Sequence, residues 1–187
     1  MTGVLGVILA AGAGTRYDGP THKLKARIGK LTVIGHACEA LRAAELDHRA
    51  IVVGAESFAG LVPDGITVLQ NPKWEQGQST SLVAAVQYAR ELDCDALVVA
   101  LGDQPGISPT AWTALGASSC SLATATYGSK SAHPIRLGKQ VWDRLPSTGD
   151  LGARELLRGQ AADVERIACA GNPEDVDVVE DLSQWIQ

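Results

Sequence analysis

The sequence predicts a three-layer α/β/α fold with a mainly parallel sheet. Short runs rich in β-branched residues alternate with longer segments of helical period, in the order strand, helix, strand, helix, strand. The five segments cover residues 4–9, 33–44, 50–53, 81–92 and 96–100. The last run contains no polar residue, as expected of a central strand that is buried on both faces.

The first strand is predicted over residues 4–9. Its apolar run continues to Gly14, so a signal peptide is the alternative interpretation. No Lys or Arg precedes the run, and Gly12 and Gly14 interrupt it long before the ~20 apolar residues that span a bilayer. We therefore expect a buried strand that runs into a loop.

Each of the two predicted helices has one apolar stripe at positions i, i+3, i+4 and i+7. The stripes are Ile34, Ala37, Cys38 and Leu41 in the first helix, and Leu82, Ala85, Val86 and Ala89 in the second. Beyond Pro109 the pattern predicts a short helix, a strand over 122–127 and a helix over 152–158. Because no repeat or linker interrupts the pattern, residues 1–187 are expected to form one domain.

Composition and charge exclude several classes of protein. Of the 187 residues, 45% are hydrophobic and 20% are charged, which suits one well-buried core. The 16 basic and 21 acidic residues give a formal charge of −5, so we expect neither a nucleic acid nor a membrane as partner. Four cysteines lack zinc spacing and are expected to be reduced core thiols of a cytoplasmic protein: Cys38, Cys94, Cys120 and Cys169.

A glycine-rich loop follows the first strand. It reads Leu9-Ala10-Ala11-Gly12-Ala13-Gly14-Thr15-Arg16, and Lys23 comes shortly after it. Closely spaced glycines let the backbone approach a ligand, and free N–H groups in such a turn favour anions. Arg16 and Lys23 could hold a triphosphate, so the loop predicts a phosphate site. A tight turn with solvated basic residues is the alternative.

Two other phosphate-binding loops do not fit the spacing. A dinucleotide-binding loop needs a third glycine where this chain has Tyr17, and it needs an acidic residue at the end of the next strand. A P-loop needs Gly-Lys-Ser/Thr at a spacing that this loop lacks. The loop is therefore assigned to neither class.

Further segments extend the loop into an ordered series of motifs. They are Asn71-Pro-Lys-Trp74-Glu-Gln-Gly77-Gln-Ser79-Thr-Ser81-Leu82, Asp103-Gln104-Pro105, and residues 149–154 and 177–182. Together they resemble the MobA-like nucleotidyltransferases, and most of all the molybdenum cofactor cytidylyltransferases. Guanylyltransferase relatives differ, since they carry a second glycine at Ala11 and a Gly-Pro-Leu-Ala-Gly stretch in place of residues 77–82. The spacing from Arg16 to Lys23 is longer than in the family.

The resemblance implies a Rossmann-like nucleotidyltransferase fold and assigns residues to roles. The catalytic residues would be Arg16, Lys23 and Asp103, and the nucleotide-binding residues would be Leu9, Ala10, Ala11, Gly12, Gly14, Ser79 and Ser81. The acceptor would contact Gln104, His133, Asp150 and Arg154. Asp103 follows a buried strand at the edge where parallel sheets bind ligands, and the resemblance adds Asp177 as a second carboxylate for Mg²⁺.

Structural roles remain as alternatives for several of these residues. Asp103 could cap a turn, and Asp177 could belong to an acidic segment that is simply exposed to solvent. Ser79 and Ser81 open the second predicted helix and could cap it, with or without contact to the nucleotide base. Trp74 and His133 are open to purely structural use, as a core residue and a loop residue.

The resemblance implies attack by an acceptor phosphate on the α-phosphate of CTP, with release of pyrophosphate. Such a nucleophile is already ionised near neutral pH, so alignment and charge neutralisation are expected to replace a general base. The expected partners are CTP or another NTP, a phosphorylated pterin-type acceptor and a molybdoenzyme that receives the product. The alternatives are a GTP-using or sugar-phosphate nucleotidyltransferase, and a non-catalytic cofactor-binding or delivery protein, which the altered spacing before Lys23 favours.

Overall fold

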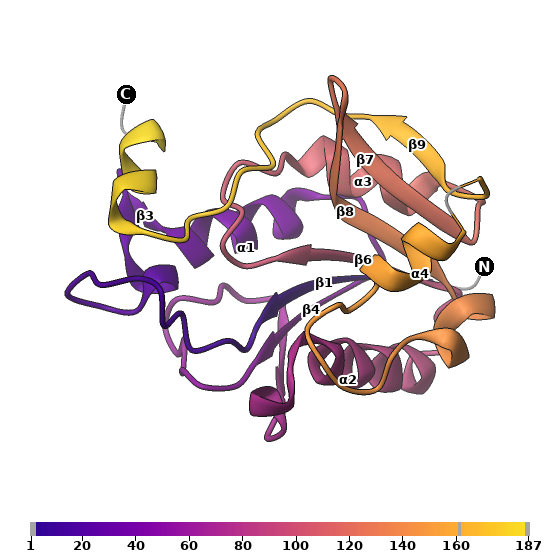
Figure 1. The fold of residues 1–187 in the computed structure, drawn as a ribbon, viewed down its shortest axis with the longest axis horizontal. Helices are drawn as coiled ribbons and strands as arrows, with labels where there is room; N and C mark the ends of the chain where they lie inside the picture. The colour runs from indigo at the N-terminus through magenta and orange to yellow at the C-terminus, as the bar shows by residue number, and fades with distance from the viewer. Residues whose placement is uncertain (1–2, 161, 186–187) are drawn as a thin grey trace.

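A computed structural model describes residues 3–160 and 162–185, and a seven-stranded sheet forms its centre (Figure 1). From edge to edge the strands are β5 (Thr67–Gln70), β4 (His48–Val53), β1 (Val4–Ala10), β6 (Ala96–Leu101), β8 (Lys130–Gly138), β7 (Leu122–Tyr127) and β9 (Glu165–Ala168). Strands β5, β4, β1 and β6 are parallel, β8 is antiparallel to both its neighbours, and β9 is parallel to β7. The predicted α/β fold with a mainly parallel sheet is confirmed.

Helices cover both faces of this sheet. The α-helices are α1 (Val33–Ala43), α2 (Gln78–Glu91), α3 (Pro109–Ala117) and α4 (Arg154–Gly159). Helices α1 and α3 lie together on one face, and α2 lies on the other (Figure 1). A hairpin joins β2 (Arg27–Ile28) to β3 (Leu31–Thr32), and 3-10 helices cover Lys23–Lys25, Trp74–Gln76, Lys139–Arg144 and Val179–Trp185. Among the described residues, no helix is long and apolar enough to cross a membrane.

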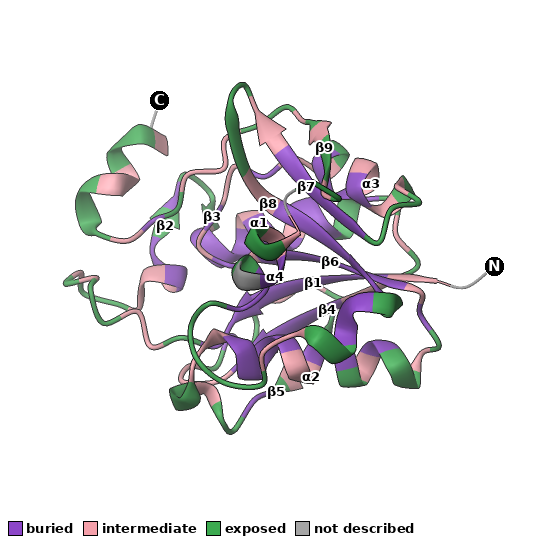
Figure 2. Ribbon diagram, turned by 45° about the vertical axis from the view of Figure 1, so that its right-hand side comes forward, coloured by how far each residue is buried: buried purple, intermediate pink, exposed green. Residues whose placement is uncertain are grey.

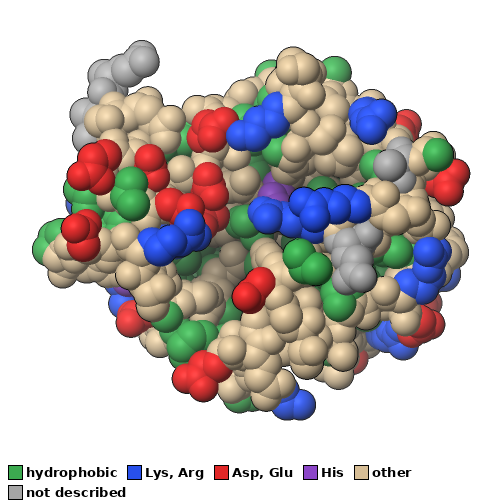
Figure 3. All heavy atoms as spheres, in the orientation of Figure 1, with side chains coloured by type: hydrophobic (Ala, Val, Ile, Leu, Met, Phe, Trp, Pro, Cys, Tyr) green, Lys and Arg blue, Asp and Glu red, His purple; other side chains and the backbone are tan. Residues whose placement is uncertain are grey.

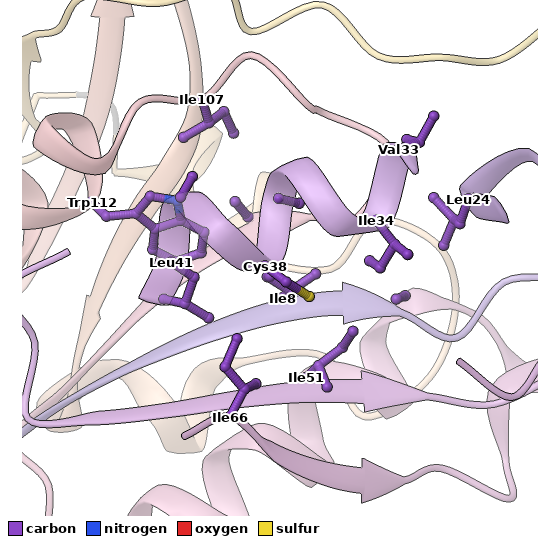
Figure 4. Packing of buried hydrophobic residues seen from close by; sticks show 14 of the residues in the cluster. Ile8, Leu24, Val33, Ile34, Cys38, Leu41, Ile51, Ile66, Ile107 and Trp112 are labelled. Atoms are coloured by element: carbon purple, nitrogen blue, oxygen red, sulfur yellow. The ribbon is translucent and has the colours of Figure 1, made fainter. Parts of the chain in front are cut away.

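Alternation along β1 divides the core between the two faces of the sheet. Ile8 belongs to the cluster that contains the apolar stripe of α1, and Figure 4 shows it beside Cys38 and Leu41. Leu5 and Val7 belong to the other cluster, which contains the stripe of α2. Both stripes are buried as predicted, and the central strands are covered on both faces (Figure 2). Close packing on both sides holds the carboxyl ends of β1 and β6 in fixed positions.

The sequence pattern does not predict β5, β8 and β9. Two of these, β5 and β9, are short edge strands whose side chains are mostly exposed. β8 begins with polar residues and contains Pro134, which argues against a strand within a sheet. The register between β7 and β8 shifts at this point, from the pair Thr124–Ile135 to the pair Ala125–Ala132. Pro134 therefore lies in a bulge, where the ladder needs no N–H donor.

Two further expectations need correction. Helix α2 begins at Gln78, three residues before its predicted start. Of the four cysteines, Cys38 and Cys94 are buried, whereas Cys120 is exposed and Cys169 is half-buried. The last two follow a helix and an edge strand, so neither lies within a covered face. All four thiols are free, as expected.

Candidate active site

Two cavities lie side by side at the carboxyl ends of β1 and β6. The first, of about 500 Å³, lies over the loop after β1, and we call it the glycine-loop cavity. The second, of about 450 Å³, lies over β8 and α4, and we call it the β8 cavity. Leu9 and Gln78 line both, so the two cavities meet there. On this face of the molecule, acidic and basic side chains gather on opposite sides of the central hollow (Figure 3).

Most predicted residues line the cavity that the sequence assigns to them. The glycine-loop cavity is lined by Leu9, Ala10, Ala11, Gly12, Gly14, Arg16, Lys23, Ser81, Asp103 and Asp177. The β8 cavity is lined by Gln104, His133 and Arg154. Two predicted residues lie elsewhere. Asp150, predicted to contact the acceptor together with Gln104, His133 and Arg154, lines the glycine-loop cavity and not the β8 cavity, and Ser79 is among the lining residues of neither cavity.

An ion-pair network occupies the acidic side of the glycine-loop cavity. Lys23 Nζ lies 2.7 Å from Asp103 Oδ2 and 3.1 Å from Asp177 Oδ1. A guanidinium nitrogen of Arg16 lies 2.8 Å from Asp177 Oδ2. Residues from the two ends of the chain thus converge, and the carboxylates that the sequence pairs as metal ligands lie together.

The C-terminal segment reaches this point by following the loop after β6. The N–H of Val176 donates to the carbonyl of Asp103 at 2.9 Å, and Gln104 Nε2 donates to the carbonyl of Pro173 at 2.9 Å. Asp181 Oδ2 then accepts the N–H groups of Asp177, at 2.8 Å, and of Val178, at 3.0 Å. Asp181 therefore fixes the turn that presents Asp177, and it does not itself line the cavity.

The ion-pair network offsets part of the free-energy cost of burying the Asp103 carboxylate. Burial raises the pKa of this carboxyl group, and the ammonium group of Lys23 opposes that rise. Burial lowers the pKa of Lys23, but its ion pairs with Asp103 and Asp177 outweigh that effect and raise it. Within the described chain, Asp103 Oδ1 is buried without a hydrogen-bond partner. Oxygens of Asp103, Asp175 and Asp177 all lie within 4.8 Å of one another, a spacing that one divalent cation could bridge.

The extra residues between Arg16 and Lys23 form a largely exposed loop, drawn in indigo in Figure 1. His22 closes this loop, because its Nδ1 accepts the N–H of Leu24 at 3.2 Å and its Nε2 lies 3.2 Å from the carbonyl of Gly12. Since Nδ1 accepts, Nε2 carries the proton and donates to Gly12. Burial lowers the pKa of His22, which favours this neutral form near pH 7. The insertion therefore leaves Lys23 directed at the carboxylates.

The first turn of α2 is held by a loop that comes much later in the chain. Gly77 precedes the helix with a φ of 101°, and a Cβ atom on it would lie 2.4 Å from the carbonyl carbon of Gly149. The carbonyl of Gly149 accepts the N–H of Ser79 at 2.9 Å. The expectation that Ser79 or Ser81 caps α2 is therefore wrong, because the residue before the helix is Gly77 and the later loop supplies the acceptor.

The side chain of a buried asparagine, Asn71, also holds the first turn of α2. Asn71 Nδ2 donates to Thr80 Oγ1 and to Ser81 Oγ, both at 2.9 Å, and Asn71 Oδ1 accepts the N–H of Lys73 at 2.9 Å. Ser81 is thus oriented beside the glycine-loop cavity. The hydroxyl of Ser79 is buried and has no partner among the residues that the structure describes.

The β8 cavity contains a histidine that is neutral at pH 7. Burial, with a smaller contribution from the nearby Arg154, lowers the pKa of His133 to about 4. The backbone of His133 is anchored by the hydroxyl of Tyr127, which donates to its carbonyl at 2.9 Å. The imidazole can therefore exchange hydrogen bonds with a ligand without adding charge to the cavity.

Comparison with known proteins decides the family. Residues 6–167 match the model of the MobA-like NTP transferase domain. The chain belongs to this family. The resemblance based on the glycine loop and the four further motifs is thereby confirmed at the level of the family.

Solved structures share the fold over almost the whole MobA-like domain. The homologue of Mycobacterium tuberculosis Rv0371c from Mycobacterium sp. strain JC1 is 28% identical, with a TM-score of 0.81 over 97% of this chain and 96% of that chain. Rv0371c of Mycobacterium tuberculosis H37Rv in complex with manganese is 24% identical, with a TM-score of 0.78 over 99% of this chain and 98% of that chain.

Curated relatives match the domain over part of their own length. The bifunctional protein GlmU of Xanthobacter autotrophicus is 30% identical over 169 residues. The match covers 86% of this chain and 36% of that protein. The MobA-like domain described here therefore spans about a third of this relative.

Several lining residues lie outside the family motifs. Lys130, Arg158 and Arg166 line the β8 cavity, and nothing in their sequence spacing distinguishes them from other surface cations. Gln78 lies inside the Gly77–Ser81 motif, but only its position at the junction of the two cavities shows its relevance. Trp74 is half-buried and lines the glycine-loop cavity, so it is not the core residue that its neighbourhood suggests.

Lys23→Ala is expected to lower the free energy of unfolding by about 2 kcal/mol at pH 7, because two carboxylates lose their shared cation. The loss should be smaller at pH 5, since protonation of Asp103, whose pKa is raised, removes the unpaired charge. MgCl₂ should restore more stability to this variant than it adds to the wild type. Denaturant unfolding at both pH values, with and without MgCl₂, measures all three effects.

Lys25→Ala is the matched control, because Lys25 lies in the same 3-10 helix and makes a half-exposed pair with Glu56 at 2.6 Å. Its loss should cost less than about 0.5 kcal/mol. Equal effects of the two lysine substitutions at pH 7 would contradict the role given to Lys23.

Acidification should destabilise the protein in part through His133. The unfolded chain binds a proton at this side chain near pH 6.5 and the folded chain only near pH 4, so stability is lost as the pH falls between these values. His133→Asn removes this contribution. When the pH falls from 7 to 4, the free energy of unfolding of the wild type should decrease by about 3 kcal/mol more than that of the variant. Urea titrations measure the difference, with His48→Asn as control, and a difference independent of pH would refute the expectation.

Proposed function

We propose that this MobA-like domain transfers CMP from CTP to a phosphorylated small acceptor of the molybdopterin type and releases pyrophosphate. The observation that carries the proposal is the junction of two cavities at Leu9 and Gln78. One cavity combines a glycine loop, cations and clustered carboxylates, as a metal-bound triphosphate requires. The other has a basic rim that suits an anionic acceptor. At the junction, an acceptor oxygen would face the α-phosphate.

Asp103, Asp175 and Asp177 would hold the divalent cation, which we take to be Mg²⁺. The buried Asp103 Oδ1 lacks a partner within the described residues, and an unsatisfied buried acceptor is unfavourable until a ligand binds it. When bound, Mg²⁺ would neutralise charge on the phosphates. Rv0371c, which has the same fold, has been solved with manganese.

The glycine loop and its two cations would orient the triphosphate. No atom lies within 4 Å of a Cβ atom built on Gly12, so a ligand can approach the backbone there. Gly14 also lines the cavity, and its φ of 63° is a backbone conformation that favours glycine. Arg16 and Lys23 both pair with Asp177. If a metal ion bound the carboxylates, the two cationic side chains could instead bind phosphate oxygens of the nucleotide.

The reaction needs alignment more than proton transfer. An oxygen of the acceptor phosphate forms a bond to the α-phosphorus of CTP while the bond from that phosphorus to the pyrophosphate oxygen breaks. The attacking oxygen is already ionised near neutral pH, so no side chain has to remove a proton. His133 would orient the acceptor by hydrogen bonds in its neutral form. The product would pass to a molybdoenzyme, and we assign the activity to the cytoplasm because all four thiols are free.

Two alternatives differ in substrate or in turnover. The first alternative is a transferase with a sugar phosphate as acceptor, or with GTP or another NTP as donor. A non-catalytic delivery protein is favoured by the longer spacing before Lys23, but the loop closed by His22 removes that argument, since Lys23 still meets Asp103 and Asp177.

Turnover is expected to be at least about tenfold faster with CTP than with GTP, because hydrogen bonds that read the base contribute about 1 to 3 kcal/mol each. Pyrophosphate release with Mg²⁺ and four NTPs measures this preference, with a molybdopterin-type acceptor in one series and a sugar 1-phosphate in another. Equal or faster use of GTP would refute the base preference. Turnover with the sugar phosphate alone would select the first alternative, and tight binding without turnover in both series would select the second.

Asp103→Asn and Asp177→Asn should each lower turnover by about 100-fold or more, the scale of losing one electrostatic group from a transition state. Each should also abolish the extra thermal stabilisation that Mg²⁺ and CTP give together, because the two ligands share one folded site. Asp181→Asn should cost less, since an amide oxygen can still accept from Asp177 and Val178. Glu180→Gln is the control, because Glu180 is an exposed acidic residue of the same segment. A larger loss for Asp181→Asn than for Asp177→Asn would show that the second ligand is misplaced.

A further inference from the structure

Three arginines stand on the rim of the β8 cavity: Arg154, Arg158 and Arg166. All three are exposed, and none makes an ion pair with a carboxylate side chain that the structure describes. Other arginines of the chain have defined structural partners. Arg136, for example, is buried and donates to the carbonyls of Gly116 and Cys120, both at 3.0 Å.

The three arginines make the potential at the cavity positive, although Asp175 also lines it and the further cation Lys130 is paired with Glu174. The chain as a whole carries a formal charge of −5, so this concentration of positive charge does not follow from its composition. A cavity walled by apolar groups focuses such a field on whatever enters it. The rim is therefore built to attract negative charge.

The cavity is too large and too apolar for a single inorganic anion. Its volume of about 450 Å³ lies in the range of cavities that hold small organic ligands. Apolar side chains line its walls, among them Leu82, Val99, Ile135, Leu157 and Val164. The occupant should therefore have a largely apolar or planar body with its charge at the ends.

Charge is distributed unevenly between the two ends of the cavity. At the end near the glycine-loop cavity the lining includes Asp175, a member of the acidic cluster, and the junction residues Leu9 and Gln78. Arg158 and Arg166 come from α4 and β9, elements that contribute nothing to the glycine-loop cavity. A phosphate held by the glycine-loop cavity's own cations would not engage these two arginines, which line only the β8 cavity.

We infer that the acceptor carries a second anionic group, remote from the attacking phosphate, and that Arg158 and Arg166 bind it together with Arg154. This inference rests on the proposed function, since it assumes that the β8 cavity binds the acceptor. It narrows the acceptor to a molecule with two anionic groups separated by a compact apolar or planar body. A sugar phosphate whose only anionic group is its phosphate does not meet this description.

Two probes separate one anion from two: phenyl phosphate and 1,4-phenylene bisphosphate. Calorimetry is carried out with the full chain, Mg²⁺ and a non-hydrolysable CTP analogue, so that the glycine-loop cavity is already filled. The wild type should bind the bisphosphate at least about tenfold more tightly than phenyl phosphate, as expected for one additional charge-assisted contact. Binding needs no turnover, so the result stands apart from the test of the transfer reaction.

The double variant Arg158→Gln, Arg166→Gln should reduce this ratio to about one, because it should weaken binding of the bisphosphate much more than binding of phenyl phosphate. Arg144→Gln is the matched control, because Arg144 is exposed and lines a separate cavity, and its ratio should equal that of the wild type. Equal affinities of the wild type for both probes would overturn the inference. An equal loss of affinity for both probes in the double variant would overturn it too, because the arginines would then act only through general attraction.

Discussion

The buried carboxylate of Asp103 is the constraint on which the site depends. A charge at the end of a covered central strand is unfavourable unless a cation lies beside it, and Lys23 supplies that cation at 2.7 Å. Asp177 joins the same ammonium group and binds Arg16 as well, so one network ties the loop after β1 to the C-terminal segment. The carboxylates in this network are the ones proposed above to bind a divalent cation.

Backbone contacts deliver these side chains from distant parts of the chain. The C-terminal segment reaches the network because Val176 binds the carbonyl of Asp103 and because Asp181 closes the next turn. The insertion before Lys23 is accommodated by His22, which joins Gly12 to Leu24. In both cases a small number of hydrogen bonds fixes the direction of a charged side chain. The length of the loop that leads to that side chain can therefore vary without moving it.

Sequence reasoning reached the fold and the glycine loop because both depend on local patterns. A covered parallel sheet is specified by the apolar stripes of α1 and α2 and by the unbroken apolar run of β6. These patterns are local, so they can be recognised without knowing which distant segments lie nearby. It missed β8, because Pro134 argues against a strand unless the bulge opposite Ala125 is known. It also missed Asp175 and Arg158, since their relevance comes from neighbours far apart in the chain. The serine cap of α2 was wrong for the same reason, because its substitute is Gly149.

The contact between Gly77 and Gly149 gives the site a particular local stability. The N–H of Ser79 has its acceptor in the later loop, and Gly149 in turn donates to the carbonyl of Gln76, so separating the two segments breaks both hydrogen bonds. We therefore expect hydrogen exchange at the start of α2 to depend on the opening of the loop around Gly149. Gln78, which lines both cavities, therefore lies on a stretch of backbone that is held by a segment synthesised much later.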